Sequence, residues 1–407
     1  MTRPAVVVTG VGLVTPAGVG ALATFEALCA GRVTAAPDPQ LRGLPADFSY
    51  AVPDLRPDRA LGRRLSGRMD RFSQMAVIAA REAVADSGLA PRDWPADRVA
   101  VLLGASGTST PALAEDFMSH MQGHPERVSP LTALRSGPSA PVADVALDLG
   151  ARGPSLALSS ACAAGNQAIA LGCELLRSGA CDVAITGGSE SARTLVHVIL
   201  LARAKALSRR RDAPESACRP FDADRDGLVL GEGAGILVLE RCEDASARGV
   251  LPRAFVAGHG SSCDAFHYAA PEPEGRGAEQ AMRAALADAG LAPGDIDHVS
   301  AHATSTPAGD LAEAHALGRL FLDVPPVTAL KSQLGHALGA AGAIGSAVAV
   351  LSLAEQTIPP TLNLDRQDAA IDLNVVRTCR RQAALRSVMS NSFGFGGHNT
   401  VVVFTDS

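Results

Sequence analysis

Cys162 is the first residue whose type and position could do chemistry. It lies in SSACAAG, residues 159–165, between a predicted strand over 155–159 and a mostly apolar predicted helix over 162–177. Free amides and the helix dipole at a helix N-terminus favour a thiolate and can hold an oxyanion. We therefore predict a nucleophilic thiol with a lowered pKa. The alternative is a buried structural cysteine, the usual role of a free cysteine.

Two histidines occupy comparable positions later in the chain. His302 directly follows a predicted strand in AHATSTPAGD, residues 301–310, and the helix that comes next carries Glu313. His336 lies among glycines in KSQLGHALGAAGA, residues 331–343, before a long Ala-rich helix. An imidazole can donate or accept a hydrogen bond near neutral pH, which suits acid–base work. A structural histidine at a strand end is the alternative.

Lysine usage draws attention to Lys331. Of the 36 basic residues, only Lys205 and Lys331 are lysines. A lysine kept among so many arginines indicates that a compact ammonium is wanted where a planar guanidinium would not fit, although chance would give the same pattern.

A glycine-rich loop is predicted near the C-terminus, in NSFGFGGHN, residues 391–399. It carries Phe393 and Phe395 between two predicted strands. One interpretation is an aromatic gate that moves on glycine hinges, and the other is a plain hairpin turn.

The elements that position these residues show an internal repeat. Residues 85–93 read ADSGLAPRD and residues 287–295 read ADAGLAPGD, 202 positions apart. Each string ends a predicted helix, with Gly88 or Gly290 as its C-terminal cap, and precedes a short predicted strand. Helices alternate with strands throughout, which favours an α/β sandwich with a pseudo-twofold axis and a central site fed by both halves.

We place the boundary between the halves at a predicted turn, giving an N-terminal half over 1–250 with the cysteine and a C-terminal half over 251–407 with both histidines and the glycine-rich loop.

Composition narrows the function class. The 407 residues are 47% hydrophobic with a net charge of −6, which is ordinary for a soluble protein and argues against nucleic acid as the main partner. The least polar stretch, Leu334 to Ala354, contains His336 and is interpreted as a buried helix, so no membrane partner is expected. No export signal is found, which favours the reducing cytoplasm.

No bound metal is expected from the sequence. The eight cysteines are scattered without a C-x-x-C pair, which indicates neither a zinc site nor a disulfide framework. DADRDG, residues 222–227, begins like a calcium loop, but Gly233 occupies the twelfth position, where an acid is required.

Positive charge gathers in two runs despite the negative total. Arg63, Arg64 and Arg68 lie in one run, with Arg71 close by, and Arg210 lies between two further arginines. These side chains form either a solvated face or a docking patch for an acidic partner.

Together these segments resemble the β-ketoacyl-acyl-carrier-protein synthases, in particular the elongating Cys-His-His type of type II fatty-acid and polyketide synthesis. The strings SSACAAG, AHATSTPAGD, KSQLGHALGAAGA and NSFGFGGHN appear in the family's order, with RPFDADRDGLVLGEGAG at 219–235 between the first two. The resemblance covers nearly the whole chain. It implies a thiolase-like fold, a duplicated five-layer αβαβα sandwich.

The resemblance also implies a decarboxylative Claisen condensation. An acyl chain would be held on Cys162 as a thioester, and malonyl-acyl-carrier protein would extend it to a 3-oxoacyl chain two carbons longer. His302 and His336 would stabilise the malonyl enolate, with Lys331 and Glu313 positioning them.

Further positions follow from the same resemblance. The amides of Cys162 and Phe395 would form an oxyanion hole, and Phe395 would gate the acyl tunnel. Asp264 and His267 would lie at the site mouth. Arg63, Arg64, Arg68 and Arg210 would dock the acyl-carrier protein, whose phosphopantetheine removes any need for a bound cofactor. A homodimer or a heterodimer with a ketosynthase-like or chain-length-factor subunit is expected.

Two positions depart from the family pattern, and these departures would alter local packing, partner choice or substrate range. Ala303 stands where many relatives have Gly, and Gly345 where many have Glu. The main alternative function is a non-condensing chain-length-factor-like partner, which would lack the reactive cysteine. A biosynthetic thiolase is disfavoured because Cys379 falls outside the glycine-rich loop. The sequence leaves open the choice between fatty-acid and polyketide or polyene synthesis, and the depth of a tunnel near residues 106–110.

Overall fold

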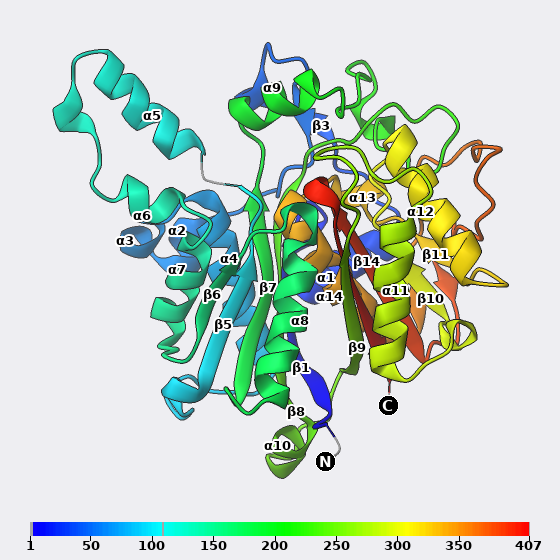
Figure 1. Cartoon of the computed structure of the whole chain (residues 1–407). Coiled ribbons are helices and arrows are strands. Elements are labelled where there is room, and N and C mark those ends of the chain that lie inside the picture. Colours follow the sequence, from blue (N-terminus) through cyan, green and yellow to red (C-terminus); the bar gives the residue numbers. More distant parts are fainter. Residues whose placement is uncertain (1–2, 108–109, 407) are drawn as a thin grey trace.

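One continuous 11-stranded sheet, made of two similar five-stranded halves and the short strand β2 (Gly18–Val19), forms the framework of the chain, for which the computed structural model describes residues 3–107 and 110–406 (Figure 1). We call the two halves the first and the second sheet. The strands of the first sheet, in spatial order, are β6 (Ser155–Leu158), β5 (Val99–Gly104), β7 (Val183–Ser191), β8 (Glu232–Arg241) and β1 (Val6–Thr15). Those of the second are β11 (Val327–Thr328), β10 (His298–Ser300), β14 (Ser387–Gly394), β15 (His398–Thr405) and β9 (Ala254–Cys263). The two orders are identical when each half is numbered from its own first strand.

The sheets meet where β1 pairs with β9, through Val7 with Phe255 and Val8 with Ala254. This pairing joins a strand from before residue 250 to a strand from after it. The division into 1–250 and 251–407 therefore stays a prediction about where the sequence repeat begins again, and it does not divide the protein into separate domains.

Helices fill three layers around the sheets, as Figure 1 shows from its left side to its right. The outer helices of the first half are α4 (Arg71–Asp86) and α7 (Ala140–Leu149), those of the second half are α11 (Arg276–Ala289) and α12 (Pro307–Leu320), and the central pair is α8 (Ala164–Arg177) and α14 (Ala341–Glu355). The thiolase-like, five-layered αβαβα fold is thereby confirmed.

The repeated strings lie where the repeat predicts. ADSGLAP ends α4 and ADAGLAP ends α11, and Gly88 and Gly290 adopt left-handed φ values of 70° and 69°. A left-handed residue after the last turn satisfies helix carbonyls, and glycine adopts that conformation without steric cost.

Helix α14 is apolar on nearly all sides because it is packed between the first and the second sheet. The segment Leu338–Glu355 is long and apolar enough to cross a membrane, yet 78% of it is buried inside the protein. This confirms the prediction of a core helix over this stretch.

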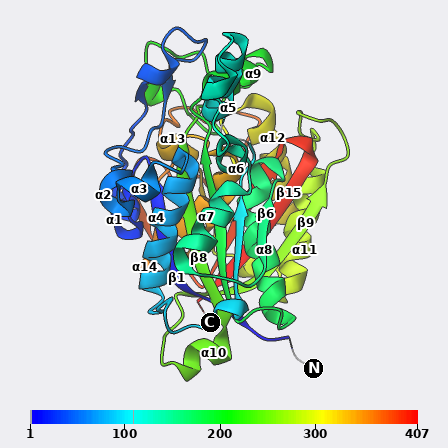
Figure 2. The ribbon, with the colours of Figure 1, turned by 90° about the vertical axis from the view of Figure 1, so that its left-hand side faces the viewer.

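Shorter elements decorate the sandwich. The helices are α1 (Ala21–Cys29), α2 (Pro57–Leu61), α3 (Arg63–Ser66), α5 (Thr110–Met121), α6 (Thr132–Ser136), α9 (Leu195–Arg203), α10 (Cys242–Ala247) and α13 (Lys331–Leu334). The short strands are β2 (Gly18–Val19), β3 (Ala36–Pro37), β4 (Phe48–Ser49), β12 (Thr357–Ile358) and β13 (Arg381–Gln382). Helix α5 projects from the body in Figure 1, and Figure 2 shows both termini at the end opposite α9.

Candidate active site

Cys162 lies in a 3₁₀ turn, Ala161–Ala163, immediately before α8, so it sits at the strand-to-helix turn as predicted, although the helix begins at Ala164 rather than at Cys162. Ala161 has a φ of 50°, a strained left-handed value for a residue with a side chain. The Cys162 carbonyl accepts a 2.7 Å hydrogen bond from Ser392 Oγ on β14. A sharp turn fixed from the opposite half therefore presents the sulfur to the cleft between the two sheets.

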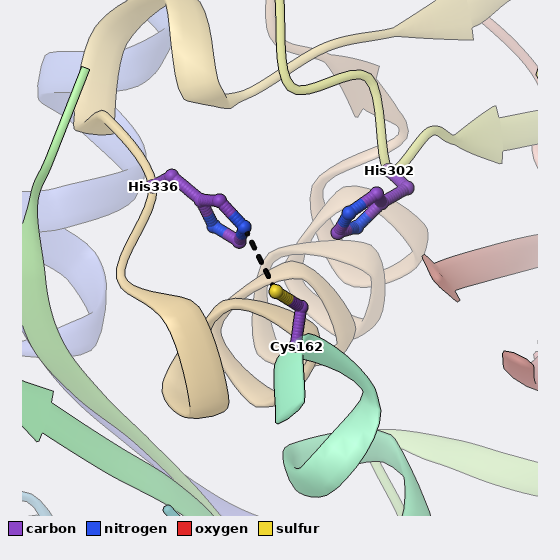
Figure 3. A group of neighbouring side chains, drawn as sticks. All are labelled: Cys162, His302 and His336. Atoms are coloured by element: carbon purple, nitrogen blue, oxygen red, sulfur yellow. Dashed lines mark hydrogen bonds between the residues drawn. The ribbon is translucent and has the colours of Figure 1, made fainter. Parts of the chain in front are cut away.

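Both histidines reach this sulfur from the C-terminal half (Figure 3). His336 Nε2 lies 3.1 Å from Cys162 Sγ, and one ligand-type atom from each of Cys162, His302 and His336 lies within 4.8 Å of the others. The imidazole rings meet edge to face with centroids 5.4 Å apart. The structure thus brings together the three side chains that the sequence singled out.

Lys331 and Glu313 hold the His302 segment from behind. Lys331 Nζ donates to the His302 carbonyl, and Glu313 accepts from the backbone amides of His302 and Ala303 at 2.9 and 2.7 Å. Ala303 has a φ of 29°, so a glycine would relieve strain at this departure from the family pattern. Asn391 Nδ2 donates a further 3.0 Å bond to Glu313.

Burial sets the charge state of the site. Burial, with the nearby Lys331 ammonium as a second cause, holds the pKa values of His302 and His336 well below their usual range. Both imidazoles are therefore neutral at pH 7 and can donate N–H bonds. Burial also lowers the pKa of Lys331 and raises that of Glu313, and each charge opposes the shift of the other.

The expected low pKa of the Cys162 thiol is wrong for the protein without substrate. Burial raises the pKa of Cys162 to about 11, although the Lys331 charge and the backbone amides of Phe395 and Cys162 oppose the shift. Desolvation of a thiolate in a dry cleft outweighs those donors. The resting site therefore holds a thiol, and the proton must leave as the sulfur attacks.

A cleft of about 760 Å³ leads to the sulfur. Asp264 lines it, whereas His267 supports its rim, where His267 Nδ1 accepts from the backbone amides of Ala269 and Ala270 at 3.0 and 2.9 Å. Phe395 lines the cleft too and is 39% exposed. The predicted mouth and gate residues thus border one opening.

The glycine-rich loop is fixed by backbone contacts. A Cβ on Gly394 would come within 2.9 Å of the Cys162 nitrogen, and the Gly396 amide donates to the Tyr268 carbonyl at 2.9 Å. Gly396 and Gly397 have φ values of 81° and 75°. These glycines let the loop run close to the nucleophile's own backbone.

The basic residues predicted to dock the carrier protein differ in their exposure and in whether their side chains are already bound within the protein. Arg63, Arg64 and Arg68 are exposed on α3 and the turn after it. Arg210 is half-buried and donates to the Asp224 carbonyl at 2.7 Å. Arg71, from the same sequence run, is bound to the buried Glu232 at 2.7 Å and contributes nothing to a surface patch.

Two polar residues of the site went unassigned by sequence reasoning. Ser392 and Asn391 lie in the quoted NSFGFGGHN string, where attention fell on the aromatic and glycine residues. Phe393 packs beside His302 with ring centroids 5.9 Å apart. Asn391 and Phe393 are two positions apart on β14 and so face the same layer, which is the pattern that could have linked both to the His302 segment. Residues 108 and 109, named for tunnel depth, lie outside the described residues.

The comparisons with known families agree with this geometry. Residues 3–245 match the family "Beta-ketoacyl synthase, N-terminal domain", and residues 253–365 match "Beta-ketoacyl synthase, C-terminal domain". The chain belongs to the beta-ketoacyl synthase family. It is 38% identical to the 3-oxoacyl-[acyl-carrier-protein] synthase 2 of Staphylococcus aureus, over 98% of this chain and 97% of the relative.

Solved structures of other beta-ketoacyl synthases share the fold. "The ishigamide ketosynthase/chain length factor" superposes with a TM-score of 0.92 at 35% identity and covers 99% of both chains. A type II polyketide acyl-carrier protein in complex with its ketosynthase bound to the hexaketide, AntDE:AntF, gives a TM-score of 0.90 at 29% identity, covering 99% of this chain and 100% of the other. Like other members, this synthase is a condensing acyltransferase acting on acyl-carrier-protein thioesters, and its complete Cys-His-His cluster disfavours the non-condensing alternative.

Proposed function

We propose that Cys162 accepts the acyl chain and that His302 and His336 drive decarboxylation of the malonyl unit. The observation that carries this assignment is the convergence of a thiol from one half with two neutral imidazoles from the other in one dry cleft. A thiol is the right acceptor because it exchanges readily with a phosphopantetheine thioester.

In the acylation step, Cys162 Sγ attacks the thioester carbonyl of acyl-carrier protein, and the new thioester forms as the pantetheine sulfur leaves. The thiol proton ends on that departing sulfur, and His336 Nε2, 3.1 Å from Sγ, can relay it. The carbonyl oxygen becomes an oxyanion that faces the amides of Cys162 and Phe395. Such preorganised donors are worth about 2.7–4 kcal/mol each.

In the condensation step, malonyl-acyl-carrier protein loses CO2 and its thioester carbonyl becomes an enolate. The N–H groups of His302 and His336 donate to that oxygen, and neutrality of both rings suits them for donation without adding a competing positive charge. The enolate carbon attacks the acyl-Cys162 carbonyl. The thiolate then leaves, which completes the 3-oxoacyl product, and it takes up one proton from water to restore the thiol.

We further propose that Arg63, Arg64 and Arg68 receive the acidic acyl-carrier protein, with Arg210 at the edge of the contact. Three exposed guanidinium groups close together on an otherwise negative chain favour an anionic partner and speed its arrival. The phosphopantetheine arm arrives with that partner.

A second thiolase-fold subunit is proposed to cover the edge of the first sheet. Edge strand β6 has Leu156 41% exposed, and α5 presents Phe117 and Met121 at 62% and 65% exposure. Exposed apolar side chains beside an unpaired strand edge are typical of a covered interface. A protein that is monomeric when produced alone, but dimeric with a co-expressed relative, would favour the heterodimer over the homodimer.

The nucleophile assignment is tested by intact mass. Incubation with acyl-acyl-carrier protein should add one acyl group to the wild type and to Cys263→Ala, which removes an exposed thiol, but not to Cys162→Ala. An unchanged adduct on Cys162→Ala would exclude this cysteine as the acceptor.

A further inference from the structure

The three catalytic side chains form a ligand set as well as a reaction site. A thiol sulfur and two imidazole nitrogens lie within 4.8 Å of one another, all on buried residues (Figure 3). Zn²⁺ accepts this combination at bond lengths of about 2.0–2.3 Å, and a three-ligand set leaves a fourth position for water. Small rotations of the side chains would close the remaining distance around one ion.

The route to this set favours a cation. Asp264 and Glu272 both line the cleft that leads to Cys162. Asp264 Oδ2 accepts from the Glu272 amide at 3.1 Å, and Glu272 Oε2 accepts from the Arg276 amide at 2.8 Å, so both carboxyl groups are held at the opening. The Arg276 guanidinium lies 3.9 Å from Glu272 Oε1 and offsets part of that charge, so Asp264 is the carboxylate that chiefly favours a divalent cation there.

The surroundings of the set explain why a metal would not be permanent. His302 Nδ1 and His336 Nδ1 are buried and have no hydrogen-bond partner within the described residues. Zinc-binding histidines normally donate that second N–H to a carboxylate or carbonyl, and losing the partner costs about 10–100-fold in affinity. The buried ammonium of Lys331 also opposes a nearby cation.

From these features we propose that Zn²⁺, or a similar thiophilic divalent ion such as Cd²⁺, binds Cys162, His302 and His336 reversibly in the unacylated enzyme and inhibits it. Binding forms a metal–sulfur bond and releases the thiol proton to water, with no change of oxidation state. An acyl group on Cys162 converts the sulfur to a thioester, which is a poor ligand, so acylation and metal binding exclude each other. This last consequence rests on the proposed role of Cys162 as the acyl acceptor, whereas the metal site itself does not.

The test uses the Cys263→Ser/Cys379→Ser double variant, because those two exposed thiols would bind zinc independently. Zinc affinity is measured by competition with a chromophoric chelator. Cobalt is added separately to detect thiolate-to-metal charge-transfer absorption. We expect one reversibly bound ion per chain, and at least a tenfold loss of affinity in each of Cys162→Ala, His302→Ala and His336→Ala. His315→Ala, on α12, should bind as the parent does.

Two outcomes would overturn the site. One is unchanged zinc affinity in Cys162→Ala, and the other is unchanged affinity in either histidine variant, which would remove the three-ligand set. A separate measurement follows acyl transfer from acyl-carrier protein, by mass, with and without saturating zinc. If zinc binds through the three residues but the adduct still forms, the inhibitory claim and the acyl-acceptor assignment fail while the metal site stands.

Discussion

The two halves of the molecule build the same turn at the start of their central helix and use it differently. In the first half, Ala161 has a φ of 50°, the 3₁₀ turn Ala161–Ala163 follows, and α8 begins. In the second half, Leu338 has a φ of 42°, the turn Leu338–Ala340 follows, and α14 begins. The residue matching Cys162 is Gly339.

The two turns differ in the room that each leaves for a side chain. A Cβ on Gly339 would lie 2.3 Å from the Ser106 nitrogen, so the second turn packs backbone against backbone and has no room for a nucleophile. The first turn instead faces the cleft and carries the thiol. The second half contributes its chemistry from the segments beside its turn, through His302 and His336. One duplicated frame thus supplies an acceptor from one side and enolate donors from the other.

The sharpest way to break this comparison is to remove the second half's donors. In His336→Ala and His302→Ala, malonyl decarboxylation should fall about 10²–10³-fold each, the effect of losing one oxyanion donor. Acylation should persist in His302→Ala and slow in His336→Ala only as far as the proton relay is lost, because Cys162 and the amides of Cys162 and Phe395 remain in place. Product CO2 and the acyl adduct are measured on the same samples.

The control for these variants is His315→Ala, which changes a histidine on α12 outside the cluster. If both histidine variants lost acylation as completely as decarboxylation, the division of labour between the halves would be wrong.

Much of this frame was predictable from the residues. The repeated ADSGLAP and ADAGLAP strings located equivalent helix ends, because a cap glycine after an amphipathic helix is a local signal. The chemistry-bearing strings located Cys162, His302 and His336. Neither the repeated turn at Leu338 nor its crowding was visible, since left-handed φ values at alanine and leucine leave no trace in composition.

The electrostatics were the harder part to predict. Position at a helix N-terminus indicated a lowered thiol pKa, but the structure places Cys162 in a site dry enough to raise it to about 11. The local sequence around a thiol indicates which hydrogen-bond donors lie near it. It does not indicate how completely the rest of the chain buries that thiol away from water. The hydrogen bond from Ser392, 230 positions away, was invisible for the same reason.

The crowding of the second turn can be tested by adding a methyl group at Gly339 and measuring the stability of the protein. Gly339→Ala should lower the free energy of unfolding by about 3 kcal/mol, because the backbone of Ser106 cannot move aside as a flexible side chain would. Its twin Cys162→Ala should change stability by less than about 1 kcal/mol, because the sulfur faces the cleft. Urea denaturation measures both. Equal losses in the two variants would show that the turns are packed alike.

Acid should weaken the second sheet more than the first. Strand β10 buries His298, whose two ring nitrogens have no hydrogen-bond partner in the described part of the chain, whereas β5 in the matching position is VAVLLG. Burial lowers the pKa of His298 to about 3 from an ordinary 6.5. The folded state therefore keeps this ring neutral, and its contribution to stability is full above pH 6.5 and lost as the pH falls toward 3.

His298→Val should remove that loss. Relative to the wild type, the variant should gain about 1.4 kcal/mol of unfolding free energy between pH 7.5 and pH 5.5, measured by urea denaturation at each pH. A difference between wild type and variant that does not change with pH would show that His298 is not the titrating group.

The smallest expected change in stability comes from Gly345→Ala, a substitution that gives α14 the residue type found at the matching position of α8. Gly345 on α14 occupies the position that Ala168 holds on α8, counting from the matched turns. A Cβ there would lie 3.6 and 3.7 Å from the hydroxyl oxygens of Ser390 and Ser300, which is ordinary contact. Gly345→Ala should therefore raise the free energy of unfolding by about 0.5–1 kcal/mol, the cost of a glycine inside a helix.

Gly342→Ala, one turn earlier on the same helix, is the matched control. Its Cβ would come within 2.8 Å of Ser392 Oγ and 2.9 Å of Asn166 Oδ1, so the same substitution should destabilise the protein. Gly345 also borders a small pocket that Lys331 and Asn391 line. A loss of stability in Gly345→Ala would show instead that the added methyl group does not fit beside the hydroxyl groups of Ser390 and Ser300.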